Sequence, residues 1–204
     1  DAISDLPEIS VENFKKENGL NEKEIIALLP GSREQEVEKM LSLMLSVRDS
    51  FKNYQFVIAG APSLPKEFYQ KFVDDDVHFV SNKTYDLLRC SRAALVTSGT
   101  ATLETALLNV PEIVCYRTSK ISYEIGKRVV KNIKFISLVN LIMDKEVVKE
   151  LIQNQLNTEN LVDELQKILE GPKRDKMLQD YELLREKLGG KGASNHAAEI
   201  IVNL

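Results

Sequence analysis

Hydrophobic and polar positions follow two alternating patterns between Ile25 and Arg117. Short runs of consecutive apolar residues are each followed by a longer stretch with apolar residues at helical spacing, as at Val37, Met40, Leu41 and Met44. The short runs predict strands over Ile25–Leu29, Phe56–Ala59, Val77–Val80, Ala93–Val96 and Glu112–Tyr116. The longer stretches predict helices over Glu34–Phe51, Lys66–Val73, Tyr85–Cys90 and Thr100–Asn109.

This alternation predicts an α/β domain with a Rossmann-like, doubly wound parallel sheet. Near-continuous apolar strands are typical of a sheet that helices cover on both faces. Residues 1–24 are polar and contain Pro7 and Gly19, so we expect a linker and a short helix before the domain begins.

The pattern changes after Arg117. We expect a helix over Ile121–Val130 and a short strand over Phe135–Leu138. Residues 145–188 are rich in Glu, Lys and Leu and are predicted to be helical throughout, divided at Gly171-Pro172. A final helix is expected over Ala193–Val202, so the domain carries extra helices at its C-terminus.

The composition of the chain excludes several classes of protein. The 204 residues are 43% hydrophobic and 28% charged, with a net charge of −4, which argues against disorder and against a general nucleic-acid binder. No apolar run approaches the roughly 20 residues that span a bilayer, and no signal-peptide pattern opens the chain. Cys90 and Cys115 form no paired motif, and His78 and His196 lack ligand spacing, so we expect no metal and a reducing compartment. The run Asp74–Asp76 is expected to be a solvated turn.

Two predicted strand ends carry candidate anion-binding chemistry. In the first, LLPGSRE, Gly31 allows close backbone approach, Ser32 is placed to cap the next helix, and Arg33 adds a cation with bidentate geometry. The alternative is a plain strand–turn–helix with a capping serine and a surface arginine.

The second strand end is TSGTATLE. Ser98, Gly99 and Thr100 stand where another helix begins, and Glu104 follows near the same mouth. A carboxylate there is placed to accept both hydroxyls of a ribose, as acidic residues do in dinucleotide folds. The alternative is that Glu104 only complements the helix dipole. Neither segment matches the usual NAD or P-loop signatures.

A basic segment interrupts the acidic chain. Residues 117–134 contain six cations and one anion, a local charge of +5, with apolar residues interleaved. Such a stretch suits an anionic membrane surface, and an ordinary helix with snorkelling lysines is the alternative.

Several motifs, taken in order, resemble one family. Together they are strongly similar to the C-terminal half of the lipid-A-disaccharide synthases, from about Ile25 to the end of the chain. The motifs are LLPGSRxxEV from Leu28, SGTATLE from Ser98, PEIVCYR from Pro111, SLVNLI from Ser137 and GGKGASNHAA from Gly189.

The resemblance implies the C-terminal domain of a two-domain, metal-free GT-B glycosyltransferase, with no cofactor. Residues 25–190 would form the nucleotide-sugar domain, and the helix at 191–204 would pack on an N-terminal domain that these residues do not include. The family transfers 2,3-diacylglucosamine from UDP to 2,3-diacylglucosamine 1-phosphate, giving lipid A disaccharide 1-phosphate and UDP. It acts as a peripheral protein on the cytoplasmic face of the inner membrane of Gram-negative bacteria.

The resemblance also assigns roles to residues. Gly31, Ser32 and Arg33 would contact the diphosphate, with Arg33 the catalytic cation that supports departure of UDP. Ser98, Gly99 and Thr100 would add donors, and Glu104 would hold the ribose. Tyr116, Arg117 and Asn140 would shape the uridine or sugar end. The general base is expected in the N-terminal domain, so we expect this chain alone to bind donor without turnover.

Two other readings remain open at this stage. One is the UDP-binding domain of another GT-B protein, such as a lipid-linked N-acetylglucosaminyltransferase or a UDP-GlcNAc 2-epimerase. The other is a non-catalytic nucleotide-binding module. The expected partners are UDP-2,3-diacylglucosamine, UDP, the lipid acceptor, the N-terminal domain and the anionic inner-membrane surface, and no nucleic acid.

Overall fold

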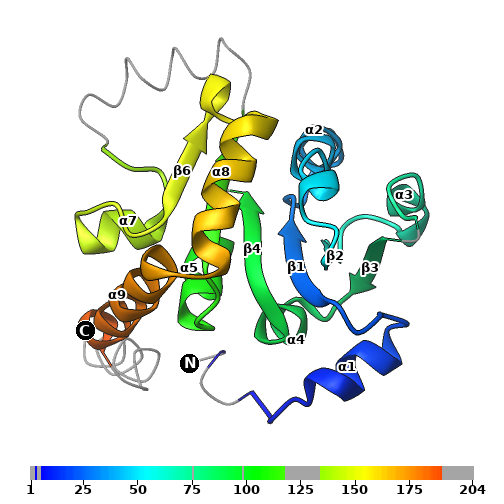
Figure 1. Cartoon of the computed structure of the whole chain (residues 1–204), viewed down its shortest axis with the longest axis horizontal. Helices are drawn as coiled ribbons and strands as arrows, with labels where there is room; N and C mark the ends of the chain where they lie inside the picture. Colours follow the sequence, from blue (N-terminus) through cyan, green and yellow to red (C-terminus); the bar gives the residue numbers. More distant parts are fainter. Residues whose placement is uncertain (1–2, 4–5, 75, 98, 118–133, 190–204) are drawn as a thin grey trace, which may run out of the picture.

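A parallel sheet forms the centre of the molecule (Figure 1). The computed structural model describes residues 3, 6–74, 76–97, 99–117 and 134–189. Within these ranges the strand order is β3-β2-β1-β4-β5-β6, and every neighbouring pair is parallel. The strands are β1 (Glu24–Leu29), β2 (Tyr54–Gly60), β3 (Val77–Ser81), β4 (Ser91–Thr97), β5 (Glu112–Tyr116) and β6 (Lys149–Ile152). This confirms the predicted α/β fold class.

Helices connect the strands and cover both faces of the sheet. Figure 1 shows α8 crossing one face beside α2. The helices in the described residues are α1 (Val11–Glu17), α2 (Glu34–Leu45), α3 (Lys66–Gln70), α4 (Thr84–Arg89), α5 (Thr100–Leu107), α7 (Leu138–Met143), α8 (Thr158–Leu169) and α9 (Pro172–Leu188), with short 3-10 turns at Arg48–Ser50 and Gln153–Gln155.

The strand side chains divide between two hydrophobic clusters, one on each face. Because successive side chains of a strand point to opposite faces, Ile26 and Leu28 join the cluster under α2 and α8. Ile25, Ala27 and Leu29 join the cluster that also contains residues of α1 and α4. Apolar strands without polar alternation are therefore explained by burial on both sides.

The short helix expected before the domain packs onto the sheet. Ser10 caps α1 by accepting a hydrogen bond from the backbone N–H of Asn13, at 3.3 Å. Phe14 of this helix is 3% exposed and belongs to the second cluster. The stretch that precedes β1 is thus tied to the same core as the strands.

Two predictions for the C-terminal part are wrong. Phe135–Leu138 is not a strand, because Ser137 instead caps α7 by accepting from the N–H of Asn140. Residues 145–188 are not helical throughout, because Lys149–Ile152 form β6 beside β5. Pairing with β5 overrides the helical propensity of Lys, Glu and Leu in so short a segment.

Other predictions agree with the structure or lie beyond it. The division at Gly171-Pro172 is confirmed, since Gly171 precedes α9 with a φ of 85° and Pro172 is its first residue. The helices expected over 121–130 and 193–202 lie outside the described residues.

Candidate functional site

The strand order reverses direction between β1 and β4. The chain builds β2 and β3 to one side of β1, and β5 and β6 to the far side of β4. Leu29 and Val96 pair near the carboxyl ends of these central strands, so the segments that follow lie next to each other at one edge. In open α/β sheets this switch point is where ligands bind. Both predicted anion-binding segments are located there.

The first segment connects β1 to α2. Gly31 has a φ of +107°, a left-handed conformation that glycine adopts without strain. A Cβ atom on Gly31 would lie 2.7 Å from a carboxylate oxygen of Glu36, so the Glu36 side chain lies over this turn. Ser32 and Arg33 are exposed, and the carbonyl oxygen of Ser32 accepts a hydrogen bond from the Ser63 hydroxyl at 2.9 Å.

The capping role expected for Ser32 is wrong. The residue at the N-cap of α2 is Arg33, and no side chain caps this helix end. The backbone N–H groups of its first turn therefore have no side-chain acceptor among the described residues, and the N-cap residue itself is an exposed arginine. This combination favours an anion.

The second segment connects β4 to α5. Gly99 is the N-cap of α5 with a φ of +151°, and no side chain among the described residues caps the helix. Gly99 and Thr100 are exposed, and Ser98 lies outside the described residues. Thr97, which precedes them, is 6% exposed, and its hydroxyl has no hydrogen-bond partner among the described residues. This helix therefore also begins at the switch point, where the backbone N–H groups of a first turn favour an anion.

Glu104 lies beside a pocket rather than at the first turn of α5. It is the fifth residue of the helix and is half-buried. One of its carboxylate oxygens, Oε1, accepts a hydrogen bond from the Tyr85 hydroxyl at 3.0 Å. Both residues line a pocket of about 480 Å³, together with Leu6, Asn82, Lys83, Thr84 and Asp86.

The sequence did not predict that these residues line one pocket. The sequence predicted that Glu104 lies near the strand end where α5 begins, but it assigned no role to Tyr85 or to the turn after β3. The available signal was that Asn82 and Lys83 follow a third strand end of the same sheet. Burial, with the neighbouring Glu104 carboxylate, raises the pKa of Tyr85, so its phenol is neutral and donates.

Tyr116 and Arg117 lie at the carboxyl end of β5. Tyr116 is half-buried and pairs with Ile152 of β6. The Arg117 guanidinium donates to the carbonyl oxygens of Gln153 and Leu156, at 3.1 and 2.7 Å. Arg117, which is exposed, therefore joins the end of β5 to the turn after β6.

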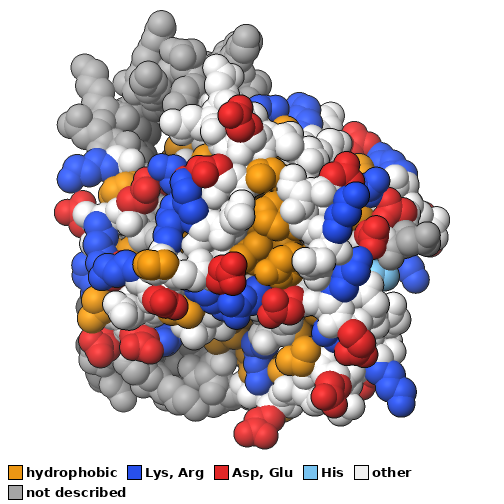
Figure 2. Space-filling model, in the orientation of Figure 1, with side chains coloured by type: hydrophobic (Ala, Val, Ile, Leu, Met, Phe, Trp, Pro, Cys, Tyr) orange, Lys and Arg blue, Asp and Glu red, His pale blue; other side chains and the backbone are white. Residues whose placement is uncertain are grey.

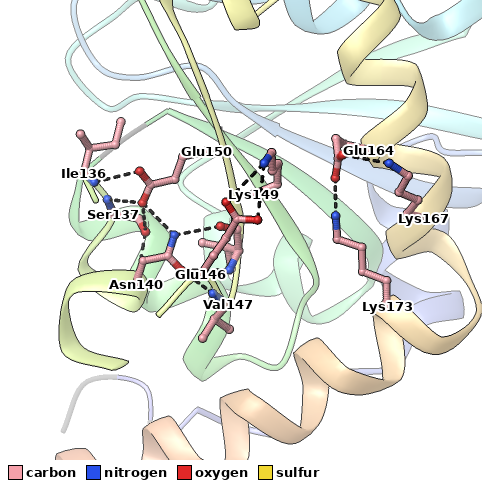
Figure 3. A network of polar contacts seen from close by, with 11 residues as sticks. Ile136, Ser137, Asn140, Glu146, Val147, Lys149, Glu150, Glu164, Lys167 and Lys173 are labelled. Carbon is pink, nitrogen blue, oxygen red and sulfur yellow. Dashed lines mark hydrogen bonds and ion pairs between the residues drawn. The ribbon is translucent and has the colours of Figure 1, made fainter. Parts of the chain in front are cut away.

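Asn140 lies apart from this edge, inside a buried network (Figure 3). Its amide oxygen accepts from the backbone N–H groups of Val147 and Val148, and its amide nitrogen donates to the Val148 carbonyl and the Glu150 carboxylate. All four hydrogen-bonding positions of the amide are thus used by the chain itself. Figure 3 shows Ser137 and Glu150 completing the network.

Neither the charged side chains nor the metal-ligating side chains of the described residues indicate a second functional site. Figure 2 shows cations and anions interspersed over the face that it presents. Across the described ranges, no cluster of three or more His, Cys, Asp or Glu side chains is arranged to hold a metal ion. Cys90 and Cys115 are free and buried, and burial raises the pKa of Cys90 to about 11.

The predicted basic segment is mostly outside the described residues, which include only its ends, Arg117 and Lys134. Lys134 is exposed and lies 3.5 Å from a carboxylate oxygen of Asp144. In the part of the chain with assigned structure, we find no helix with the length and hydropathy needed to cross a membrane.

Comparison with known proteins assigns the chain to a family. The lipid-A-disaccharide synthetase family pattern matches residues 3–203. The chain belongs to this family. The lipid-A-disaccharide synthase of Syntrophus aciditrophicus (strain SB) is 40% identical over 188 residues, which cover 88% of this chain and 49% of that protein. The chain spans about half the length of the curated relatives it matches.

Solved structures of other proteins resemble the fold of this chain. WaaG, a glycosyltransferase involved in lipopolysaccharide biosynthesis, matches with a TM-score of 0.59 at 18% identity, over 98% of this chain and 52% of its own. The UDP-GlcNAc 2-epimerase of Neisseria meningitidis, bound to UDP-GlcNAc, matches with a TM-score of 0.59 at 16% identity, over 95% of this chain and 49% of its own. The TM-scores show a shared GT-B-like fold, and at these low identities they show the fold alone. The family assignment rests on the match over residues 3–203.

Proposed function

We propose that this chain is the donor-binding half of a lipid-A-disaccharide synthase. It binds the nucleotide of UDP-2,3-diacylglucosamine, whose sugar is transferred to 2,3-diacylglucosamine 1-phosphate with release of UDP. The observation that carries the proposal is the joint position of two helix starts and the Glu104 pocket at one edge of the sheet. Family membership supplies the reaction.

The diphosphate is assigned to the two helix starts. The turn at Gly31 and the backbone N–H groups after Arg33 and Gly99 can bind an anion, and no side chain of the described residues caps either helix. The Arg33 guanidinium adds a full positive charge at the same place. As the bond to the sugar breaks, charge develops on UDP, and donors already in position stabilise it. Ser98 and Thr100 remain predicted contributors of hydroxyl groups.

The ribose is assigned to Glu104. The carboxylate has about four acceptor positions, and the Tyr85 hydroxyl uses one of them. The two hydroxyls of a ribose can occupy others. Tyr116 and Arg117 are assigned to the uridine or sugar end, whereas the amide of Asn140 has no unused hydrogen-bonding group for a ligand.

The acceptor side of the reaction is assigned to residues beyond this chain. Deprotonation of the acceptor hydroxyl needs a general base, which we expect from the other domain of the whole enzyme. The basic segment is expected to face the anionic membrane surface or the phosphorylated lipid. We therefore expect the 204-residue chain to bind UDP and to form no disaccharide.

Calorimetric titration of the chain with UDP tests the proposal. Glu104→Gln removes the charge at nearly constant size, and losing a hydrogen bond to a charged group costs about 1.5–3 kcal/mol, a drop in affinity of roughly 10-fold or more. The matched control is Glu182→Gln, an exposed glutamate of α9. Equal affinity in wild type and Glu104→Gln, or no binding at about millimolar UDP, would contradict the proposed site.

A further inference from the structure

The contact between Tyr85 and Glu104 links two helices that follow different strands. Tyr85 is the second residue of α4, after β3, and Glu104 lies on α5, after β4. Those strands are separated in the sheet by β2 and β1. Their side chains nevertheless meet, with 3.0 Å between the phenol oxygen and Oε1 of the carboxylate. Both line the same pocket, so the hydrogen bond is part of its wall.

The bond restricts an otherwise adaptable side chain. A glutamate on a helix has three side-chain torsions, and its carboxylate can adopt many orientations toward a half-open pocket. The hydrogen bond from a half-buried phenol selects one of these orientations. It occupies a single acceptor position on Oε1 and leaves Oε2 without a partner among the described residues. The carboxylate therefore presents a fixed pair of acceptor positions to a ligand.

A fixed carboxylate suits one chemical group in particular. Two neighbouring hydroxyls present two donors at a spacing that both oxygens of one carboxylate can accept. A ligand with a single hydroxyl donates to only one of the two carboxylate oxygens. The benefit of holding Glu104 in place is thus larger for a ligand with a vicinal diol than for one lacking a hydroxyl.

We propose that Tyr85 is a positioning residue that orients Glu104 for the vicinal diol of a ribonucleotide, and so makes the pocket discriminate against 2′-deoxyribonucleotides. This inference rests on the proposed function, because it requires the nucleotide to bind at Glu104. Tyr85 itself acts through the carboxylate rather than on the reacting atoms.

The experiment compares UDP with 2′-deoxy-UDP as ligands of the chain, by calorimetry. Wild type is expected to prefer UDP, and Glu104→Gln to lose most of that preference. Tyr85→Phe removes only the hydroxyl. It is expected to weaken UDP binding by about 2- to 10-fold, the range for an immobilised side chain, and to change 2′-deoxy-UDP binding less. Tyr54→Phe is the matched control, since Tyr54 is half-buried at the start of β2.

Each outcome separates the two proposals. If Glu104→Gln leaves both affinities unchanged, the proposed function at this pocket fails, and the role of Tyr85 fails with it. If Glu104→Gln abolishes the preference while Tyr85→Phe retains it, the nucleotide site stands and the inference is overturned. Equal weakening of both ligands by Tyr85→Phe also overturns it, because that pattern indicates a general structural effect.

A second variant keeps the test decisive if Tyr85→Phe folds poorly, which amide NMR spectra will show. Glu104→Asp retains the charge but withdraws the carboxylate by one methylene, beyond simultaneous reach of Tyr85 and the ligand. We expect it to lower the ratio of the two affinities toward that of Glu104→Gln. Retention of the full wild-type ratio in Glu104→Asp would overturn the inference.

Discussion

Glu112 provides a sharp test of how burial controls the stability of this domain. It is the first residue of β5, it is fully buried, and within the described part of the chain neither carboxylate oxygen has a hydrogen-bond partner. Burial holds the pKa of this carboxyl well above its usual range, because an ionised carboxylate without partners is costly to keep away from water. In the unfolded chain the same group titrates near its ordinary value of about 4.3.

The sign of the pH dependence follows from these two states. Above the ordinary pKa the unfolded chain has lost the proton while the folded chain keeps it, so the folded state binds more protons. The free energy of unfolding then falls as the pH rises, by up to about 1.4 kcal/mol per pH unit, until the pH passes the raised pKa of the folded state. The stability that the protonated Glu112 carboxyl gives to the folded state is therefore fully present only below the ordinary pKa of about 4.3.

Glu112→Gln isolates this contribution, because the amide is nearly isosteric and does not ionise. Urea unfolding of both proteins from pH 5 to pH 8 is expected to show the smallest difference in stability at pH 5 and a growing advantage of the variant as the pH rises. Other titrating groups, such as His78, whose pKa burial lowers, are common to both proteins and cancel in the difference. A constant difference across the pH range would refute the reasoning, and exposed Glu182→Gln should show that flat behaviour.

Two further predictions concern the turn after β1 and the buried network of Figure 3. Gly31→Ala places a side chain at a φ of +107° and against Glu36, at a cost of roughly 1–3 kcal/mol. It should weaken UDP binding in calorimetry about fivefold or more, and an unchanged affinity would remove the turn from the diphosphate site. Glu150→Gln cannot accept all of the donors that now converge on this carboxylate, including the N–H and hydroxyl of Ser137. Thermal unfolding should show a loss of about 1–3 kcal/mol, and a stability equal to wild type would contradict the structural role of the network.

Local sequence patterns determined most of the sheet and the two helix starts to which the proposed site is assigned. Runs such as Ile25–Leu29 are apolar at every position because both faces of the strand are buried, and that pattern is visible without any long-range information. Small residues and hydroxyls directly after a strand mark the place where a helix begins and anions are favoured. The turn at Gly31 and the start at Gly99 were therefore predictable from neighbouring residues alone.

Tertiary packing decided the features that depend on residues distant in the sequence. Lys149–Ile152 has the composition of a helix and becomes a strand because β5 offers it a pairing edge. Asn140 carries a side chain suited to a ligand, yet the network around Glu150 uses all of its hydrogen-bonding groups.

The contact between Tyr85 and Glu104 at the proposed site also depends on residues that are distant in the sequence. They are 19 positions apart, and only the strand order brings the helices that carry them together. The local chain determines which residues form strands, turns and helix starts, because those preferences involve near neighbours. Which side chains meet across the sheet depends on the packing of the whole domain, which no short stretch of sequence specifies.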